Sequence, residues 1–365
     1  MSGFENLYQA HLKSRKGKRN KSEVIEFEMN LGLNLIMLNA ELMCGKYYPR
    51  PYKEFKIHDP KERLIHALAY RDRIVQHSLC DNVLAPYMER HLIYDNAASR
   101  KGKGTHFAMD RLNRFLREYY RQYGPDGYFL KMDVRKFYDN IDHRILYGIL
   151  EKAFGNDEKV LGLLWKYIDS YHTESGKGIP MGNQSSQWFA LCYLDGMDRL
   201  IKEKQGIKYY TRYMDDAILI HHDRQYLKQC LSAIRGYLRV ERQLELNEKT
   251  QIIPLSQGVD YLGFHFYITE QGKVIRKLRS SNKKRIKKKI KSYRHAYRIG
   301  KMDYDAVKRS IVSYKGHLSH GNTYHLQRQL LSHLVLSKQT RQQREDYTKK
   351  LYEGINEHEK NDKDR

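Results

Sequence analysis

Several features that mark other classes of protein are scarce in this chain of 365 residues. It has four cysteines (Cys44, Cys80, Cys192 and Cys230) and no Cys-x-x-Cys pair, which argues against a zinc site and against a disulfide framework. No apolar run approaches the ~20 residues that cross a bilayer. The N-terminus also lacks the apolar region of a signal peptide. We therefore expect a protein of the reducing cytoplasm with no membrane partner.

Acidic residues are also in short supply. The 43 Asp and Glu residues face 67 Lys and Arg residues, which gives a formal net charge of +24. Such an excess favours polyanions and predicts binding that weakens steeply with salt. Basic charge alone is not specific for nucleic acid, because anionic membranes attract it too.

Two adjacent carboxylates, Asp215 and Asp216, lie between two short apolar and aromatic runs. The runs, at 208–213 and 217–222, have the length of strands and predict a hairpin with a tight turn. Such a turn would hold both carboxylates at one end of a sheet, where their repulsion is costly unless a cation neutralises them. Ordinary turn chemistry is the alternative explanation of an Asp-Asp pair.

A third carboxylate, Asp133, ends an apolar strand that starts at Tyr128. We expect it to meet the Asp215 turn, because three carboxylates at one point suit two Mg²⁺ ions about 3.5–4 Å apart, with Mn²⁺ as a substitute. One ion would activate an attacking oxygen and the other would stabilise the leaving oxygens. Asp139 and Asp142 are expected to cap the helix that follows.

The order of these residues resembles the palm of a reverse transcriptase: Asp133, an aromatic residue five positions later, and then Tyr213-Met214-Asp215-Asp216. Further segments resemble motifs of the same family, in the family's order, over about residues 50 to 265. They are the fingers segment at 71–76, the Gly-rich segment at 178–187, the later palm motif at 246–250 and the primer-grip turn at 261–264. The resemblance implies an α+β right-hand polymerase fold with fingers, a palm of antiparallel sheet plus helices, and a three-helix thumb.

One departure within the Gly-rich segment points to a subfamily. The chain has Met181-Gly182 and Ser186-Gln187 where most bacterial reverse transcriptases carry Gln-Gly and Ser-Pro. That combination resembles the bacterial and phage enzymes of diversity-generating retroelements, which copy a template-repeat RNA into cDNA with errors at template adenines, for targeted gene diversification by mutagenic retrohoming. A Met thioether barely hydrogen-bonds near a nucleotide where a Gln amide would, and this weakens discrimination. A packing role for Met181 is the alternative.

The resemblance also implies partners. They are an RNA template, a DNA or RNA primer, deoxynucleoside triphosphates, a small basic accessory variability determinant protein and structured flanking RNA. Two alternative functions stay open. One is a reverse transcriptase of another bacterial class, retron-like or phage-defence. The other is a catalytically inactive palm kept as an RNA-binding scaffold.

Roles for single residues follow from the same resemblance. Asp133, Asp215 and Asp216 would be the catalytic metal ligands, with Asp216 the less direct one, and Lys249 would neutralise or protonate the departing pyrophosphate. Residues that would bind the nucleotide are Lys56, Arg63, Tyr138, Met181, Gly182 and Gln187, with Tyr138 as a steric gate against a 2′-hydroxyl. Residues that would bind nucleic acid outside the thumb are Arg71, Tyr213, Met214, Leu262 and Gly263. For Lys56, Arg63 and Lys249, a surface charge is the alternative.

Composition and periodicity divide the chain into four parts. Residues 1–49 form an N-terminal helical extension, with a basic segment from Lys13 to Lys21 that is expected to be mobile and a helix from Val24 to Met43. Residues 50–268 form the fingers and palm, with helices over 151–171 and 225–244. Residues 269–340 form a basic helical thumb, and residues 341–365 a mixed-charge tail.

The thumb is expected to be a compact bundle of three amphipathic helices. The first, Ser281 to Ile299, contains no acid and presents Ile286 and Ile290 on its apolar face. The second follows Asp303 as N-cap. The third runs over 323–336 with Leu326, Leu330 and Leu334 inward. The cations expected to contact backbone phosphates, rather than form a merely solvated face, are Lys283, Lys284, Arg285, Lys287, Lys288 and Lys291.

Overall fold

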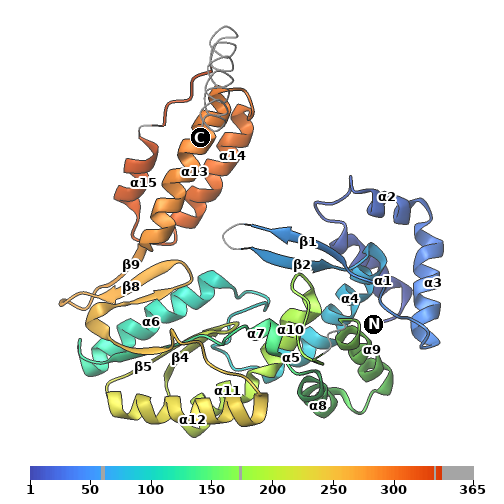
Figure 1. The fold of residues 1–365 in the computed structure, drawn as a ribbon, viewed down its shortest axis with the longest axis horizontal. Coiled ribbons are helices and arrows are strands. Elements are labelled where there is room, and N and C mark those ends of the chain that lie inside the picture. Colours follow the sequence, from blue (N-terminus) through green and yellow to red (C-terminus); the bar gives the residue numbers. More distant parts are fainter. Residues whose placement is uncertain (59–61, 172–174, 333, 339–365) are drawn as a thin grey trace, which may run out of the picture. The chain divides into compact units, whose positions relative to one another are not determined.

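The computed structural model describes residues 1–58, 62–171, 175–332 and 334–338 (Figure 1). The chain divides into two compact units, Met1–Gln257 and Gly258–Arg365, and each is described by itself. Both contain helices and antiparallel strands, so the expected α+β class is confirmed. Within the described ranges, no helix combines the length and the apolar character that a membrane span requires.

The centre of the first unit is a four-stranded antiparallel sheet with the order β4-β5-β3-β6. Its strands are β3 (Tyr128–Met132), β4 (Tyr209–Tyr213), β5 (Asp216–His221) and β6 (Gln251–Pro254). The hairpin predicted around Asp215 is confirmed, because Tyr213 pairs with Asp216 and leaves Met214 and Asp215 as a two-residue turn.

Helices cover both faces of this sheet. Helix α12 (Arg224–Arg242) packs against β3, β5 and β6, and α6 (Thr105–Tyr123) packs against β4; the two lie on opposite sides of the sheet in Figure 1. This arrangement explains why four consecutive residues of β5, Ala217 to Ile220, are all buried. A strand covered on one face only would alternate between buried and exposed positions.

The rest of the first unit consists of a two-stranded hairpin and a series of helices. The hairpin consists of β1 (Lys53–Ile57) and β2 (Arg63–Ala67). The helices that precede the sheet are α1 (Phe4–Ser14), α2 (Ser22–Met29), α3 (Leu31–Met43), α4 (Tyr70–Leu79), η1 (Cys80–Leu84) and α5 (Ala85–His91). The helices inserted between its strands are α7 (Phe137–Asn140), α8 (His143–Phe154), α9 (Glu158–Asp169), α10 (Gln184–Tyr193), α11 (Asp195–Arg199) and η2 (Leu200–Lys204).

The N-terminal region differs from the sequence prediction in its helices. The single helix expected from Val24 to Met43 is broken at Asn30, whose backbone (φ −128°, ψ 43°) leaves the helical region. The basic segment is not free at its start. The Lys13 Nζ donates to Asp81 at 2.7 Å and Arg15 Nη1 donates to Glu28 at 2.6 Å. The mobility expected of this segment stays a prediction.

Helix caps explain where other predictions succeed and fail. Asp142 caps α8 as expected, accepting from the N–H groups of Arg144 and Ile145 at 2.9 and 3.1 Å. Asp139 does not cap, because it lies inside α7, whose N-cap position is Lys136. The helix expected over 151–171 is two helices, since α8 ends at Phe154 and Asp157 caps α9. The helix expected over 225–244 is confirmed as α12.

The second unit begins with a three-stranded antiparallel sheet. It contains β7 (Val259–Tyr261), β8 (Phe264–Ile268) and β9 (Val274–Leu278), followed by α13 (Ser280–Arg298), α14 (Tyr304–Leu318) and α15 (Tyr324–Leu331). Helix α13 agrees with the prediction, with Ile286 and Ile290 buried, and Asp303 caps α14 by accepting from the Ala306 N–H at 2.6 Å. The strands up to residue 268, assigned to the palm by sequence, group here with these helices.

The expected third helix of a compact bundle is wrong in extent and burial. Helix α15 ends at Leu331 and contains no buried residue, so Leu326 and Leu330 are not core residues and Leu334 lies beyond the helix. Helices α13 and α14 pack on each other instead. The mixed-charge tail expected at 341–365 lies outside the described residues.

Candidate active site

The β4–β5 turn and the end of β3 bring two carboxylates together. Met132 pairs with Ala217 on β5, so Asp133 follows β3 directly beside the turn that carries Asp215. The Asp215 and Asp133 carboxyl groups lie within hydrogen-bonding reach of each other. Burial, and then the negative charge of Asp133, raises the pKa of Asp215 to about 6. Two hard oxygen donors held against their own repulsion fit a divalent cation such as Mg²⁺.

Asp216 is placed differently. It begins β5, and its Oδ1 lies 3.8 Å from the Nζ of Lys131 on the neighbouring strand β3. Across the described ranges, no three His, Cys, Asp or Glu side chains gather closely enough to form a metal site. The geometry therefore differs from the expected convergence of three carboxylates. Asp133 and Asp215 form a pair, whereas the third carboxylate, Asp216, lies beside the ammonium group of Lys131.

Tyr138 stands close to this carboxylate pair. Its backbone carbonyl accepts from the Ile179 N–H at 2.9 Å, which ties α7 to the Gly-rich segment. Burial, and then the charge of Asp215, raises the pKa of Tyr138 to about 12. The half-buried ring therefore lies near the Asp215 carboxylate.

The Gly-rich segment is fixed to the elements that precede it. The His66 N–H on β2 donates to the Met181 carbonyl at 3.1 Å. Gly182 has φ +111°, and a Cβ built there would lie 2.9 Å from Cγ2 of Ile65. Only glycine fits this close, left-handed approach without strain. The Gly-rich segment therefore requires glycine at position 182, because a side chain there would collide with Ile65 of β2.

Two buried or strained residues hold the start of α10. The buried Gln76 side chain donates to Ser185 Oγ at 2.8 Å and accepts from the Gln184 N–H at 3.1 Å. Ser99, with φ 54°, donates from its hydroxyl to Oε1 of Gln187 at 2.6 Å. Sequence reasoning named Gln187 but missed Ser99, because a left-handed serine leaves no pattern along the chain.

The later palm motif lies against Asp133. The Asn247 N–H donates to the Asp133 carbonyl at 2.7 Å, and the Lys249 N–H donates to Asn247 Oδ1 at 3.1 Å. The Lys249 side chain itself is exposed. The motif that sequence placed more than a hundred residues after Asp133 therefore contacts its backbone directly, with the lysine two residues from that contact.

Lys56 and Arg63, the two cations expected to bind the nucleotide from the fingers, lie on the β1–β2 hairpin. Lys56 pairs across the hairpin with Leu64, and Ile57 pairs with Arg63, so Lys56 and Arg63 point to opposite faces of the two strands. The Lys56 ammonium lies 2.9 Å from Glu62. The structure therefore does not bring Lys56 and Arg63 together as one cationic grip.

Arg71 is engaged within the protein. Its guanidinium donates to Glu41, lies 3.6 Å from Asp72 Oδ1 and covers the Tyr47 ring at 5.6 Å from the centroid. These contacts give Arg71 a role in joining α3 to α4. A nucleic-acid contact by this residue stays a prediction.

In the second unit, the predicted primer-grip turn has a defined shape. Leu262 and Gly263 have φ angles of 47° and 90°, as in the type I′ turn that joins two strands through two residues. The Gly263 carbonyl accepts from the Arg279 N–H and from Asn282 Nδ2, both at 3.1 Å. The start of α13 therefore supports the turn.

The cations of α13 form a stripe. Lys284, Lys287, Lys288 and Lys291 are exposed and spaced three and four residues apart, on the face opposite the buried Ile286 and Ile290. Arg285 is also exposed, whereas Lys283 is half-buried. The stripe therefore consists of Lys284, Lys287, Lys288 and Lys291.

Two further residues of the site escaped the sequence analysis. Arg212 and Asp198 are fully buried and form an ion pair with 2.6 Å between Arg212 Nη2 and Asp198 Oδ2. The available signal was an arginine inside a buried strand whose other members are uncharged, three tyrosines and a threonine. Its partner lies fourteen residues away on α11, a distance at which no periodicity links the two.

Comparison with known proteins identifies the family. The model of the reverse transcriptase (RNA-dependent DNA polymerase) family matches residues 56–266, which is more than half of the chain. The chain therefore belongs to the reverse transcriptase family, and its α+β structure with an antiparallel palm sheet is that of a right-hand polymerase.

Curated relatives are distant. The chain is similar to the group II intron-encoded protein LtrA of Lactococcus lactis subsp. cremoris, with 22% identity over 267 residues that cover 69% of this chain and 42% of that protein. It is also similar to the putative COX1/OXI3 intron 2 protein of Saccharomyces cerevisiae, with 27% identity over 235 residues, 59% of this chain and 26% of that protein. The chain spans less than half the length of either relative.

Solved structures include a similar chain in the telomerase of Candida albicans in complex with a fragment of telomeric RNA. The match has 14% identity and a TM-score of 0.48 and covers 69% of this chain and 51% of that chain. A telomerase of Candida tropicalis matches with 15% identity and a TM-score of 0.49, over 79% of this chain and 58% of that chain.

Proposed function

We propose that this chain is an RNA-directed DNA polymerase that works from the site around Asp133 and Asp215. The observation that carries the proposal is the meeting of these two carboxylates at the β4–β5 turn, with Tyr138 beside them. A scaffold without catalysis would have no need to hold two like charges together, since the pair opposes folding.

The reaction is nucleotidyl transfer. The primer 3′-hydroxyl attacks the α-phosphate of a deoxynucleoside triphosphate, a new phosphodiester bond forms, and pyrophosphate leaves. Divalent cations held by Asp133 and Asp215 would supply neutralisation of the charge that develops on the phosphate oxygens. The protein contributes chiefly by positioning the reactants, as in other phosphoryl transfers.

Other residues of the site have roles that fit this reaction. The Tyr138 ring would lie under the sugar and exclude a 2′-hydroxyl. The backbone of the Gly-rich segment at Gly182 would lie close to the base pair. Lys249, two residues from the contact with the Asp133 backbone, would neutralise the departing pyrophosphate.

The cationic stripe of α13 would follow the phosphates of the template–primer duplex. Four lysines on one helical face, with no acid anywhere in α13, match a polyanion, and the packed apolar face holds the stripe outward. Sequence would then be read by base pairing, and the protein would contribute affinity through the backbone.

Within this activity, we propose the diversity-generating type. The support is Met181, which lies in the Gly-rich segment where most bacterial relatives carry Gln and which the His66 N–H fixes through its carbonyl. Such an enzyme would copy a template-repeat RNA with errors at template adenines and work with a small basic accessory protein and structured flanking RNA. It would act in the cytoplasm of a bacterium, with a bacterial or phage gene as its source.

The test is primer extension on an RNA template with Mg²⁺, followed by sequencing of the products. Errors concentrated opposite template adenines support the diversity-generating type. Evenly spread errors keep the polymerase and assign it to another class, such as retron-like or phage-defence enzymes. Binding without extension, even with accessory protein and native RNA added, contradicts the proposal and favours an RNA-binding scaffold.

A further inference from the structure

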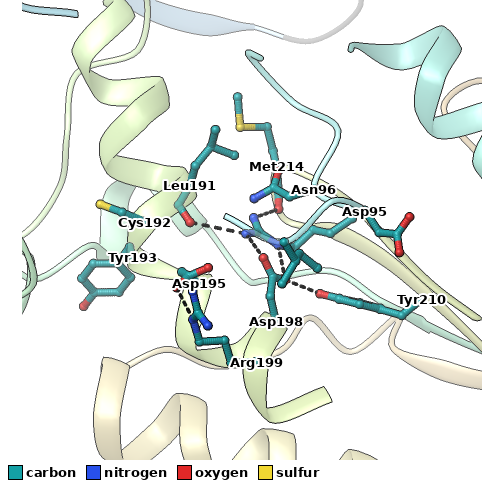
Figure 2. A network of polar contacts seen from close by, with 12 residues as sticks. Asp95, Asn96, Leu191, Cys192, Tyr193, Asp195, Asp198, Arg199, Tyr210 and Met214 are labelled. Atoms are coloured by element: carbon teal, nitrogen blue, oxygen red, sulfur yellow. Dashed lines mark hydrogen bonds and ion pairs between the residues drawn. The ribbon is translucent and has the colours of Figure 1, made fainter. Parts of the chain in front are cut away.

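A buried polar network that has no part in the reaction above lies against Met214 of the β4–β5 turn (Figure 2). Its centre is the guanidinium of Arg212, on β4, with no exposed surface. Nε and Nη2 donate to the two oxygens of Asp198 at 2.7 and 2.6 Å. Tyr210 adds a third bond to Asp198, from its hydroxyl at 2.5 Å. The network is therefore a charged pair with its own hydrogen-bonded support.

The remaining donors of Arg212 reach two other elements. Nη1 donates to the Met214 carbonyl at 2.7 Å, and Nη2 donates to the Leu191 carbonyl of α10 at 3.3 Å. One side chain thus joins Met214, the residue before Asp215, to helix α10, which begins within the Gly-rich segment. A bidentate fork with donors left over is a geometry that Arg can supply and Lys cannot.

The peptide held by Arg212 leads directly into Asp215. The Met214 carbonyl and the Asp215 N–H belong to one planar unit, so the Arg212 bond to this carbonyl also fixes the direction in which the chain enters Asp215. The orientation of this peptide in turn sets the position from which the Asp215 side chain leaves the backbone.

Backbone strain at the turn makes this support necessary. Met214 has φ 55°, in the left-handed region that residues other than Gly seldom adopt. Such residues persist where their surroundings hold them, often at functional sites. The Arg212 bond to the Met214 carbonyl is a direct restraint on this conformation.

We propose that Arg212 is a positioning residue for Asp215. Anchored on Asp198, it holds the Met214–Asp215 peptide so that the Asp215 carboxylate faces Asp133 and the pair binds a divalent cation. This inference rests on the proposed function for its catalytic meaning, but its metal-binding content can be measured without nucleic acid.

The experiment uses two variants that should fold. Arg212→Lys keeps the charge opposite Asp198 and cannot make all three sets of bonds. The double variant Arg212→Met/Asp198→Leu replaces the buried pair with apolar groups, an exchange that proteins often tolerate. Tyr210→Phe is the matched control, because it removes a bond to Asp198 and leaves the bond to the turn in place.

Mn²⁺ affinity of the protein alone, followed by the electron paramagnetic resonance of free Mn²⁺, is the first readout. We expect both test variants to lose about 10-fold to 100-fold, as when the partners of a metal ligand are removed, and Tyr210→Phe to stay within about twofold. In extension assays, the Mg²⁺ requirement should rise and kcat should fall, with the primer–template Kd unchanged. Adding Met214→Gly to Arg212→Lys should restore part of the Mn²⁺ affinity, because Gly adopts the turn conformation without strain.

Unchanged Mn²⁺ affinity in both folded test variants would overturn the inference, whatever the activity of the wild type. An equal loss in Tyr210→Phe would also overturn it, because the effect would then follow from general loosening of the network. Failure of the wild-type protein to extend a primer, with the affinity losses still observed, would instead remove the proposed function and leave the positioning role intact.

Discussion

At the scale of single residues, the Asp133–Asp215 pair links charge to stability. Burial and the charge of Asp133 raise the pKa of Asp215 to about 6, above the value of 3.8 for an unperturbed Asp. The folded state therefore binds this proton more tightly than the unfolded state. The stability contributed by the group is complete below pH 3.8 and is lost as the pH rises through about 6.

The metal-free protein should accordingly gain stability from Asp215→Asn at pH 7.5, by about 1 kcal/mol, and gain little at pH 5. The measurement is the free energy of unfolding, or Tm, at both pH values. Asp126→Asn, which removes an exposed carboxylate from the loop before β3, is the control and should show no such pH-dependent gain. A destabilised Asp215→Asn at pH 7.5 would show that the pair does not carry unrelieved repulsion.

Sugar selection is a second property of one residue. Replacing Tyr138 with Ala removes the ring near Asp215 and should raise the ratio of ribonucleotide to deoxyribonucleotide kcat/KM by about 10-fold or more. Tyr138→Phe keeps the ring and should keep the selectivity. Equal ratios in the wild type and the Ala variant would place the steric gate elsewhere.

Single residues also mark where sequence reasoning ends. Asp133, Asp215 and Tyr138 could be found because each lies at a fixed spacing within a local motif. Arg212 could not be given its partner, since Asp198 meets it only through the packing of α11 against β4. The position of Asp216 beside Lys131 depends on the register between two strands, which a motif does not state.

At the scale of elements, replacing two different glycines with Ala should change the stability in opposite directions. Gly182→Ala places a Cβ 2.9 Å from Ile65 at φ +111° and should cost about 1–3 kcal/mol. It should also raise the KM for nucleotides, because the Gly-rich segment must shift away from β2. Gly148→Ala, inside α8 with no atom within 4 Å of the new Cβ, should stabilise by about 0.5–1 kcal/mol.

Thermal unfolding of the two variants, with nucleotide KM values, checks this pair. A Gly182→Ala protein as stable and as active as the wild type would mean that the contact between the segment and β2 is not needed. Gly148→Ala serves as the control for the substitution itself, and its activity should equal that of the wild type.

Helices and strands that are specified by a short stretch of sequence were the ones that could be predicted. The β4–β5 hairpin, α12 and α13 followed from patterns within twenty residues, and all three are present. The break at Asn30 and the split before Asp157 depend on single backbone departures inside otherwise continuous apolar patterns. The inward face assigned to Leu326, Leu330 and Leu334 assumed that amphipathic spacing implies burial, but α15 buries no residue.

At the scale of the whole molecule, the charge of +24 implies binding that depends on salt. The triple variant Lys284→Gln, Lys288→Gln and Lys291→Gln removes three cations of the stripe on α13. If each contacts a phosphate, the slope of log K against log salt concentration for primer–template binding should fall in magnitude by about 2–3.

A matched variant separates the stripe from net charge. Lys228→Gln, Arg235→Gln and Arg239→Gln remove three exposed cations from α12 and change the total charge equally. Primer–template titrations at several salt concentrations should show a smaller change in slope for this control. Equal slopes for the two triple variants would mean that the stripe contributes only as part of the overall charge.

The central claim is that the Asp133–Asp215 pair catalyses template-directed DNA synthesis. Its most direct test is addition of one deoxynucleotide to a primer on an RNA template with Mg²⁺, under single-turnover conditions, by the wild type, Asp215→Asn and Asp126→Asn. We predict that Asp215→Asn binds primer–template as the wild type does and extends it at least about 100-fold more slowly, and that Asp126→Asn extends normally. Extension by Asp215→Asn at the wild-type rate would contradict the claim.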